Sequence, residues 1–114
     1  MAAQPLKLSG RIWIESPEGP LIGKGRIELL EHILELGSIR QAAIQMNLSY
    51  RQAWQMIDHM NTYCEAPVVI SHRGGKGGGS AEVTEAGRQA IQQFHHFQQL
   101  FSAFLEKHSQ EIKL

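Results

Sequence analysis

One stretch, residues 37–60 with the sequence GSIRQAAIQMNLSYRQAWQMIDHM, limits what this chain can fold into more than any other. It predicts two short helices joined by a tight turn. Ala42 and Ala43 are small where the second helix must approach the first closely, and Asn47 can adopt the left-handed backbone conformation that the turn needs. The pattern is typical of a helix-turn-helix, although an ordinary helical hairpin shows the same periodicity.

The second helix of this pair is predicted to run from about Ser49 to Tyr63. Ser49 offers a hydroxyl to cap its first turn, and Ala53, Ile57 and Met60 recur at spacings of four and three to form a buried stripe. In a helix-turn-helix the second helix enters the DNA major groove. This helix is therefore the candidate recognition helix.

Polar side chains on and around this helix are the candidate DNA contacts. Arginine can bind guanine through two hydrogen bonds and glutamine can bind adenine, while hydroxyls and amides can hold phosphate. A hydrated helix face is the alternative interpretation. The candidates on the two helices are Ser38, which also caps the first helix of the pair, Arg40, Ser49, Tyr50, Arg51, Gln52, Gln55 and His59.

The formal net charge of the 114 residues is zero, which does not favour a nucleic-acid binder because phosphate contacts dominate affinity. The distribution of charge matters more than the sum. Residues 37–57 carry Arg40 and Arg51 and no acid, and residues 66–81 carry Arg73 and Lys76 and no acid. A locally basic face is therefore expected within a neutral chain.

A glycine-rich hairpin is predicted after the helices. Residues 68–70 and 81–83 indicate two short strands, and the loop between them has the sequence HRGGKGGGS. Glycines allow close approach of the backbone to phosphate, and two cations supply charge. A nucleotide-binding P-loop is excluded, because Lys76 is followed by glycine and the loop returns to a strand. The wing candidates are Arg73, Gly74, Gly75, Lys76 and Gly77.

The remaining segments complete a single domain over residues 1–114. Alternating apolar residues over 6–15 predict a half-buried strand, within an N-terminal β-hairpin over residues 1–24. A helix is expected over 25–36, with Ile27, Leu30, Ile33 and Leu34 in the core and Leu29 at the margin, followed by Gly37 as its C-terminal stop. The three helices then span 25–63 and the wing spans 67–83.

The last helix is predicted over residues 84–108, capped by Thr84. Its apolar residues recur at spacings of four and three and form a heptad-like seam. We interpret part of this seam as a dimer interface, with purely internal packing as the alternative. The residues of the seam are Ala90, Phe94, Phe97, Phe101 and Phe104.

Several classes of protein are not indicated. The sequence has no run long and apolar enough to span a membrane and no apolar N-terminal signal, so a cytoplasmic protein is expected. The lone Cys64 is expected to pack rather than react. The six histidines show no metal-ligand spacing, and no nucleophile–base pair is evident. Neither an enzyme nor a metal or cofactor site is expected.

Taken together, the chain resembles the N-terminal DNA-binding domain of the ModE family of molybdate-responsive bacterial regulators, and more distantly the winged helix-turn-helix of LysR-type regulators. The motifs that carry the resemblance cover about residues 6–88, and the combination of SYRxAW with a glycine-only wing is the most specific of them. The matching residues are Gly25-Arg26, Leu29-Leu30, Gly37-Ser38-Ile39, Ala42-Ala43, Ser49-Tyr50-Arg51, Ala53-Trp54, Asp58, Met60-Asn61, Pro67-Val68, the glycine run 74–79 with Lys76, Thr84 and Gly87.

The resemblance implies a mainly α-helical winged helix-turn-helix with small β-hairpins and a long C-terminal dimerisation helix. It also implies a homodimer on double-stranded DNA, with Ser49, Tyr50, Arg51, Gln52, Gln55, Arg73 and Lys76 at the DNA-facing positions. Family members that sense molybdate carry further domains after the last helix, so molybdate is not expected to bind this chain, which is either a single-domain relative or a fragment. The alternative function is a protein-interaction module that retains the winged-helix scaffold.

Overall fold

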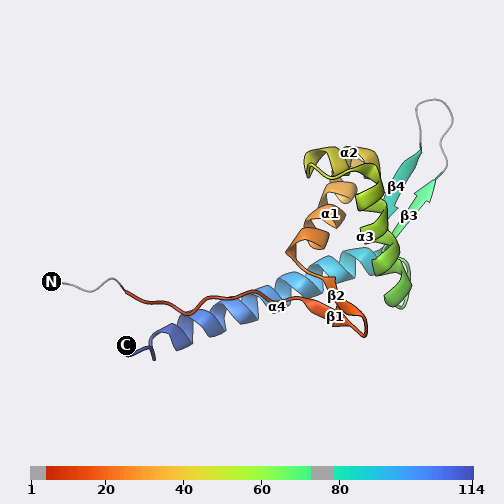
Figure 1. Cartoon of the computed structure of the whole chain (residues 1–114). Coiled ribbons are helices and arrows are strands. Elements are labelled where there is room, and N and C mark those ends of the chain that lie inside the picture. Colours follow the sequence, from red (N-terminus) through yellow and green to blue (C-terminus); the bar gives the residue numbers. More distant parts are fainter. Residues whose placement is uncertain (1–4, 73–78) are drawn as a thin grey trace.

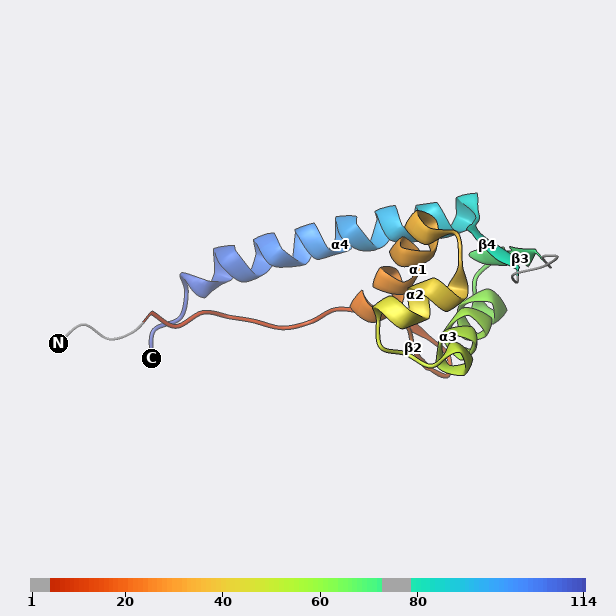
Figure 2. The same ribbon diagram turned by 90° about the horizontal axis from the view of Figure 1, so that it is seen from above.

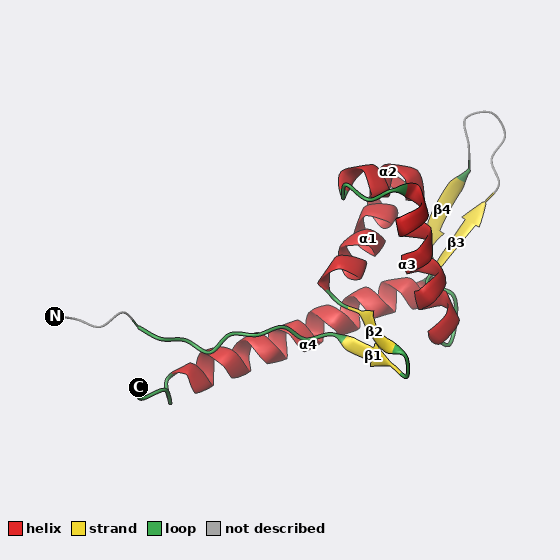
Figure 3. Cartoon of the chain, in the orientation of Figure 1, coloured by secondary structure: helices red, strands yellow, loops and turns green. Residues whose placement is uncertain are grey.

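The computed structural model describes residues 5–72 and 79–114, and it confirms the predicted fold class (Figures 1 and 3). Three helices form a body, a two-stranded wing projects from one end of it, and a long helix extends beyond the other end. The elements in chain order are β1 (Ile14–Ser16), β2 (Gly19–Ile22), α1 (Lys24–Leu36), α2 (Ile39–Gln45), α3 (Tyr50–Tyr63), β3 (Val69–His72), β4 (Ser80–Val83) and α4 (Glu85–Ser109).

The core surrounds α1, which packs against α2, α4 and β4. The predicted positions Ile27, Leu30 and Ile33 are buried, and Gly37 ends the helix in the left-handed region at φ 66°. The prediction was wrong for two residues: Leu29 is fully buried, whereas Leu34 is 50% exposed. Because α1 packs against several elements, the buried face of the helix differs from the face that the apolar periodicity predicted for one packing partner.

The predicted strand over residues 6–15 is wrong for most of its length. Strand β1 begins only at Ile14, which pairs with Ile22 of the four-residue strand β2. The shortness of β2 explains the difference, because the alternating residues before Ile14 have no strand to pair with. The N-terminal hairpin is therefore confined to residues 14–22.

Residues 5–13, called the arm below, instead run extended beside α4, as Figures 1 and 2 show. The backbone N–H of Leu8 donates a hydrogen bond of 2.7 Å to Ser109 Oγ near the end of α4. Gly10 lies close to the Phe101 ring, to which a Cβ at this position would approach within 3.1 Å. The arm thus covers one side of the projecting half of α4.

The projection of α4 makes the molecule elongated. Its radius of gyration is 17.9 Å, whereas a compact domain of this length has about 13 Å. None of the helices formed by the described residues meets the length and hydropathy needed to cross a bilayer.

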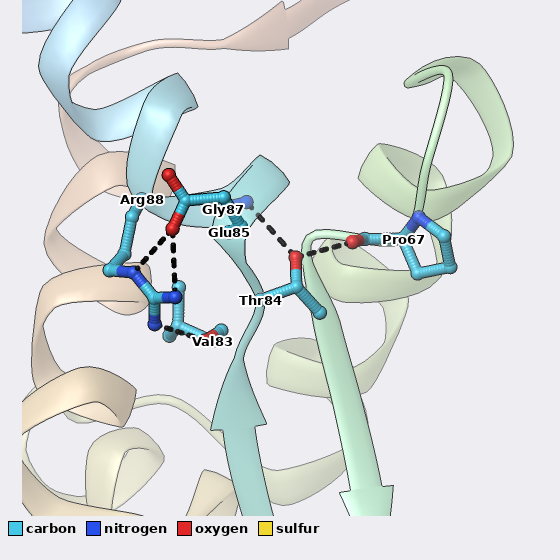
Figure 4. A network of polar contacts seen from close by, with 6 residues as sticks. All are labelled: Pro67, Val83, Thr84, Glu85, Gly87 and Arg88. Carbon is cyan, nitrogen blue, oxygen red and sulfur yellow. Dashed lines mark hydrogen bonds and ion pairs between the residues drawn. The ribbon is translucent and has the colours of Figure 1, made fainter.

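Strand β4 passes directly into α4 through a network of polar contacts at Thr84 (Figure 4). The Thr84 hydroxyl donates to the carbonyl oxygen of Pro67 at 2.6 Å and accepts from the backbone N–H of Gly87 at 3.1 Å. This confirms Thr84 as the N-cap of α4. Arg88 completes the junction by donating to the Glu85 carboxylate and to the carbonyl oxygen of Val83. The base of the wing and the start of α4 are therefore held together.

Cys64 is the residue at which α3 ends, and it packs against the hydrophobic core. Partial burial raises the pKa of its thiol above the ordinary value, so the fraction of reactive thiolate at neutral pH is reduced. Its position agrees with the prediction that this cysteine packs rather than reacts.

The substitution Gly87→Ala should destabilise the fold. An added Cβ would lie 2.3 Å from the carbonyl oxygen of Val68 and 2.6 Å from Val83 Cγ1, so the wing base or α4 would have to shift. We expect a loss of about 1–3 kcal/mol in the free energy of unfolding, measured by urea denaturation.

The matched control is Gly25→Ala in the first turn of α1, where a Cβ would meet no described atom within 4 Å. This change should be neutral or stabilising by up to about 1 kcal/mol, because alanine is the better helix former. Equal stability of the two variants would contradict the close approach at Gly87.

Candidate nucleic-acid interface

The turn between α2 and α3 has the geometry of a helix-turn-helix. Ser38 caps α2 by accepting a hydrogen bond from the backbone N–H of Gln41, and Asn47 adopts φ 55° in the turn. Ala42, Ala43 and Ala53 are buried, as close approach of the two helices requires. These observations confirm the predicted cap at Ser38, the left-handed conformation of Asn47 and the close approach at the alanines.

Helix α3 begins with a reciprocal cap that involves two of the candidate DNA contacts. Ser49 Oγ accepts from the backbone N–H of Gln52 at 3.0 Å, and Gln52 Oε1 accepts from the backbone N–H of Ser49 at 2.8 Å. This capping box occupies the Gln52 carbonyl oxygen but leaves the two N–H donors of its amide to meet a ligand. The sequence predicted Ser49 as a cap but not the reciprocal bond from Gln52.

The surface of α3 carries one cation, Arg51, near its start and an acid only later. Arg51 and Gln55 are exposed, and Asp58 is also exposed. The first turn of α3 contains no acidic residue, so its partial positive charge is not neutralised by the chain itself. An anion is therefore favoured at this end of the helix.

Arg40 and Tyr50 form a pair that joins α2 to the start of α3. The Arg40 guanidinium lies over the Tyr50 ring at 4.8 Å from its centroid, and the edge of Trp54 meets the same ring at 6.3 Å. A cation over an aromatic face is weakly attracted to it, so this contact orders both side chains. The sequence placed Arg40 and Tyr50 in the site but did not predict this contact.

His59 lies at the junction of α3 with α1. Arg26 Nη1 donates to His59 Nδ1 at 2.7 Å and to the carbonyl oxygen of Leu21 at 2.7 Å, and the edge of the Tyr63 ring meets the imidazole. Because arginine can only donate, Nδ1 is the acceptor and is not offered to DNA. Only Nε2 of His59 remains for a contact with a ligand.

The wing is an antiparallel pair of strands attached to α3 through Asn61. Asn61 Oδ1 accepts from the backbone N–H of Val68 at 2.8 Å, and Asn61 Nδ2 donates to the carbonyl oxygen of Val69 at 3.1 Å. The strands pair from Val69 with Val83 to His72 with Ser80, which confirms the predicted hairpin. The base of the wing is therefore attached directly to α3.

The candidate residues at the tip of the wing, Arg73, Gly74, Gly75, Lys76 and Gly77, lie outside the described residues. Beside the tip, His72 Nε2 lies 3.4 Å from Glu82 Oε2 across the two strands. Glu82 follows immediately after the acid-free stretch noted in the sequence, so the wing is less basic than that stretch alone suggested.

The aromatic seam of α4 is divided among three environments. Phe94 is only 1% exposed because α1 packs over the first half of α4, so its assignment to a dimer interface was wrong. Ala90 is partly buried against the same core, and Phe101 is partly buried on the side of the arm. Phe97 and Phe104 remain exposed, together with Leu100, and these three residues are called the α4 strip below.

Among the described residues, no group of three or more His, Cys, Asp or Glu side chains is arranged to hold a metal ion. The candidate site is a surface that consists of a capped, outward-facing helix beside a projecting hairpin. This combination defines a winged helix-turn-helix.

The comparison with known families agrees with this architecture. Residues 25–88, from α1 into the start of α4, match the family described as bacterial regulatory helix-turn-helix protein, LysR family. The chain therefore belongs to the LysR-type family of bacterial regulatory helix-turn-helix proteins, and its curated relatives include several proteins named ModE.

Three of these relatives indicate how far the similarity extends. The molybdenum transport protein ModE of Azotobacter vinelandii is 32% identical over 102 residues, which are 90% of this chain and 38% of the relative. The molybdenum-pterin-binding protein MopA of Rhodobacter capsulatus is 39% identical over 82% of this chain and 35% of its own length. The DNA-binding transcriptional dual regulator ModE of Escherichia coli K12 is 46% identical over 59% of this chain. The chain thus spans between about a quarter and two-fifths of the length of these relatives, from 26% to 38%.

Replacing Asn61 with alanine should loosen the wing from α3. The change removes both hydrogen bonds to β3 and leaves the Val68 N–H and the Val69 carbonyl without this partner, which costs about 1–3 kcal/mol for each buried group. We expect faster amide hydrogen exchange in β3 and β4 together with a lower free energy of unfolding. Thr62→Ala is the matched control, since Thr62 is exposed and bonds only to the Asp58 carbonyl of its own helix. If both variants exchanged alike, Asn61 would not hold the wing.

Proposed function

We propose that the chain is a DNA-binding transcription regulator that inserts α3 into the major groove and contacts the flanking backbone with its wing. The observation that carries the proposal is the capped, acid-free start of α3, which is exposed next to a wing fixed to the same helix by Asn61. The LysR-type family match and the ModE-type relatives support it.

Within this proposal the exposed polar residues have separate roles. Arg51 and Gln55, together with the free amide hydrogens of Gln52, contact base edges, because they lie on exposed positions of α3. Arg40 and Tyr50 contact phosphate from the α2–α3 junction, with Ser38 and Ser49 near the same helix ends. The sequence adds Arg73, Lys76 and the glycines of the wing tip as backbone contacts.

We further propose that two copies pair through the α4 strip and read a roughly palindromic site. Phe97, Leu100 and Phe104 recur at spacings of three and four along a helix that projects from the body, and all three are exposed in the single chain. A two-fold axis would place two α3 helices in successive major grooves, with half-sites about one helical turn, or roughly 34 Å, apart.

Three observations favour a second function, that of a protein-interaction module. The net charge is zero and Glu82 lies at the wing, while the α4 strip presents apolar surface that could accept a partner helix. A mobility shift with random genomic fragments at low salt distinguishes the two functions. Absence of retardation at micromolar protein would favour the interaction module.

The substitution Arg51→Ala should weaken binding to a selected site by about 1–3 kcal/mol and relax base preference, because a bidentate contact to a base is lost. Fluorescence anisotropy on sites selected from a genomic DNA pool measures the change. Lys76→Ala should instead weaken specific and random DNA alike and reduce the dependence of affinity on salt.

The control for Arg51 is Lys107→Ala, which removes an exposed cation from the last turn of α4. It should leave DNA affinity close to that of the unaltered protein. Equal losses on selected and random DNA for Arg51→Ala would count against its contact with bases.

The substitution Phe104→Asp should dissociate the dimer, since it buries a charge in the proposed apolar contact. Analytical ultracentrifugation should show a monomer at concentrations where the unaltered chain is a dimer. Gln99→Asp is the control, because Gln99 is exposed on the same helix but away from the strip. A monomeric unaltered chain, or a dimer that tolerates Phe104→Asp, would argue against pairing through this strip.

A further inference from the structure

A cleft of about 980 Å³ lies within the single chain, between the arm, the β1–β2 hairpin, the start of α1 and the middle of α4. Small-molecule sites in proteins have volumes of about 300–1,000 Å³, so the cleft can hold an organic ligand. It does not overlap the α4 strip. On α4 it is lined by Gln98, Phe101, Ser102 and Leu105, whereas the strip consists of Phe97, Leu100 and Phe104.

The cleft is lined by large apolar side chains and by cationic side chains. Trp13, Met56, Phe101 and Leu105 supply apolar surface, and Trp13 is half exposed although its ring is held by a bond of 2.8 Å from Nε1 to Glu15 Oε1. Large apolar side chains that are ordered but only partly covered are typical of sites that bind apolar groups.

The charges of the lining favour an anion. The cleft is lined by three cationic residues and one acidic residue, although the chain as a whole is neutral. The cations are Arg11, Lys24 and Arg26, and the acid is Glu28. The two recorded contacts of Arg26 both use Nη1, so other N–H donors of its guanidinium can meet a ligand. Arg26 is partly buried, and this desolvation lowers the pKa of its guanidinium, so a counter-charge would stabilise the cation.

We propose that this cleft binds an amphipathic organic anion, with an aromatic or aliphatic body against Trp13 and Phe101 and its charged group toward Lys24 and Arg26. This site lies beyond the proposed DNA-binding function and does not depend on it. Such a ligand would also touch α3 directly through Met56, and indirectly through Arg26, which is bonded to His59 of that helix.

The test uses 8-anilinonaphthalene-1-sulfonate, a fluorescent aromatic sulfonate, with the full chain in its native assembly and without DNA. We expect a saturable rise in fluorescence with one site per chain. Affinity should fall as salt increases, because the ionic contact is screened. N-phenyl-1-naphthylamine, which has the same rings without the sulfonate, should bind more weakly and without salt dependence. Equal affinity for the two probes, or no saturable binding, would overturn the proposal.

Two pairs of variants locate the bound probe. Ser102→Phe adds a ring inside the cleft, whereas Ala103→Phe adds the same ring at the next exposed position of α4, which does not line it. The first should weaken binding by more than about tenfold and the second should not, because only the first occupies the volume of the site. Lys24→Gln should weaken binding about two- to fivefold, as expected for an exposed ionic contact, and Lys107→Gln should not.

Two other outcomes would contradict the assignment. If Phe104→Asp abolished binding of the probe while Ser102→Phe did not, the probe would bind the α4 strip and not the cleft. If the probe bound only the monomeric Phe104→Asp variant, a second copy of the chain would be covering the cleft. Neither result would bear on DNA affinity, which is measured separately with Arg51→Ala, so the two proposals fail independently.

Discussion

The two hydrogen bonds of the Asn61 amide join α3 to the wing, and the shape of the proposed DNA-binding surface depends on them. Asn61 sits near the end of α3 and bonds to two successive backbone groups at the entry to β3. Thr84 and Gly87 then fix the other strand of the wing to α4. Hydrogen bonds from the Asn61 and Thr84 side chains to the backbone thereby join α3, the wing and α4 at one place. We therefore expect these contacts at the base of the wing to fix its position relative to α3.

Much of this arrangement follows from local sequence signals. The caps at Ser38, Ser49 and Thr84, the left-handed Asn47 and the buried stripe of α3 could all be predicted, since each depends on residues within one or two turns. The failures concern long-range contacts. The burial of Leu34 and Phe94 was predicted wrongly, because periodicity identifies one face of a helix but not how many elements pack around it. A strand was predicted wrongly over residues 6–13, because an alternating pattern does not show whether a second strand is present to pair with it. The Arg26–His59 bond joins residues 33 positions apart and had no sequence signal.

The division of α4 has consequences for how the protein can use its surfaces. Its first half is part of the subunit core, its projecting half carries an exposed apolar strip on one side, and its other side faces the arm and the cleft. A single helix thus separates a proposed pairing surface from a proposed ligand site.

The reciprocal cap of α3 restricts which residues can replace Gln52. Gln52 closes the cap with its carbonyl oxygen while its amide hydrogens face outward. Glutamate is the other residue type that closes such a cap, and it would bring a negative charge against phosphate. Replacing Gln52 with glutamate would therefore keep the cap but repel phosphate, and replacing it with most other residues would lose the cap and destabilise the helix. Within the proposed function, a change of base preference is therefore expected to arise at Arg51 and Gln55 and not at Gln52.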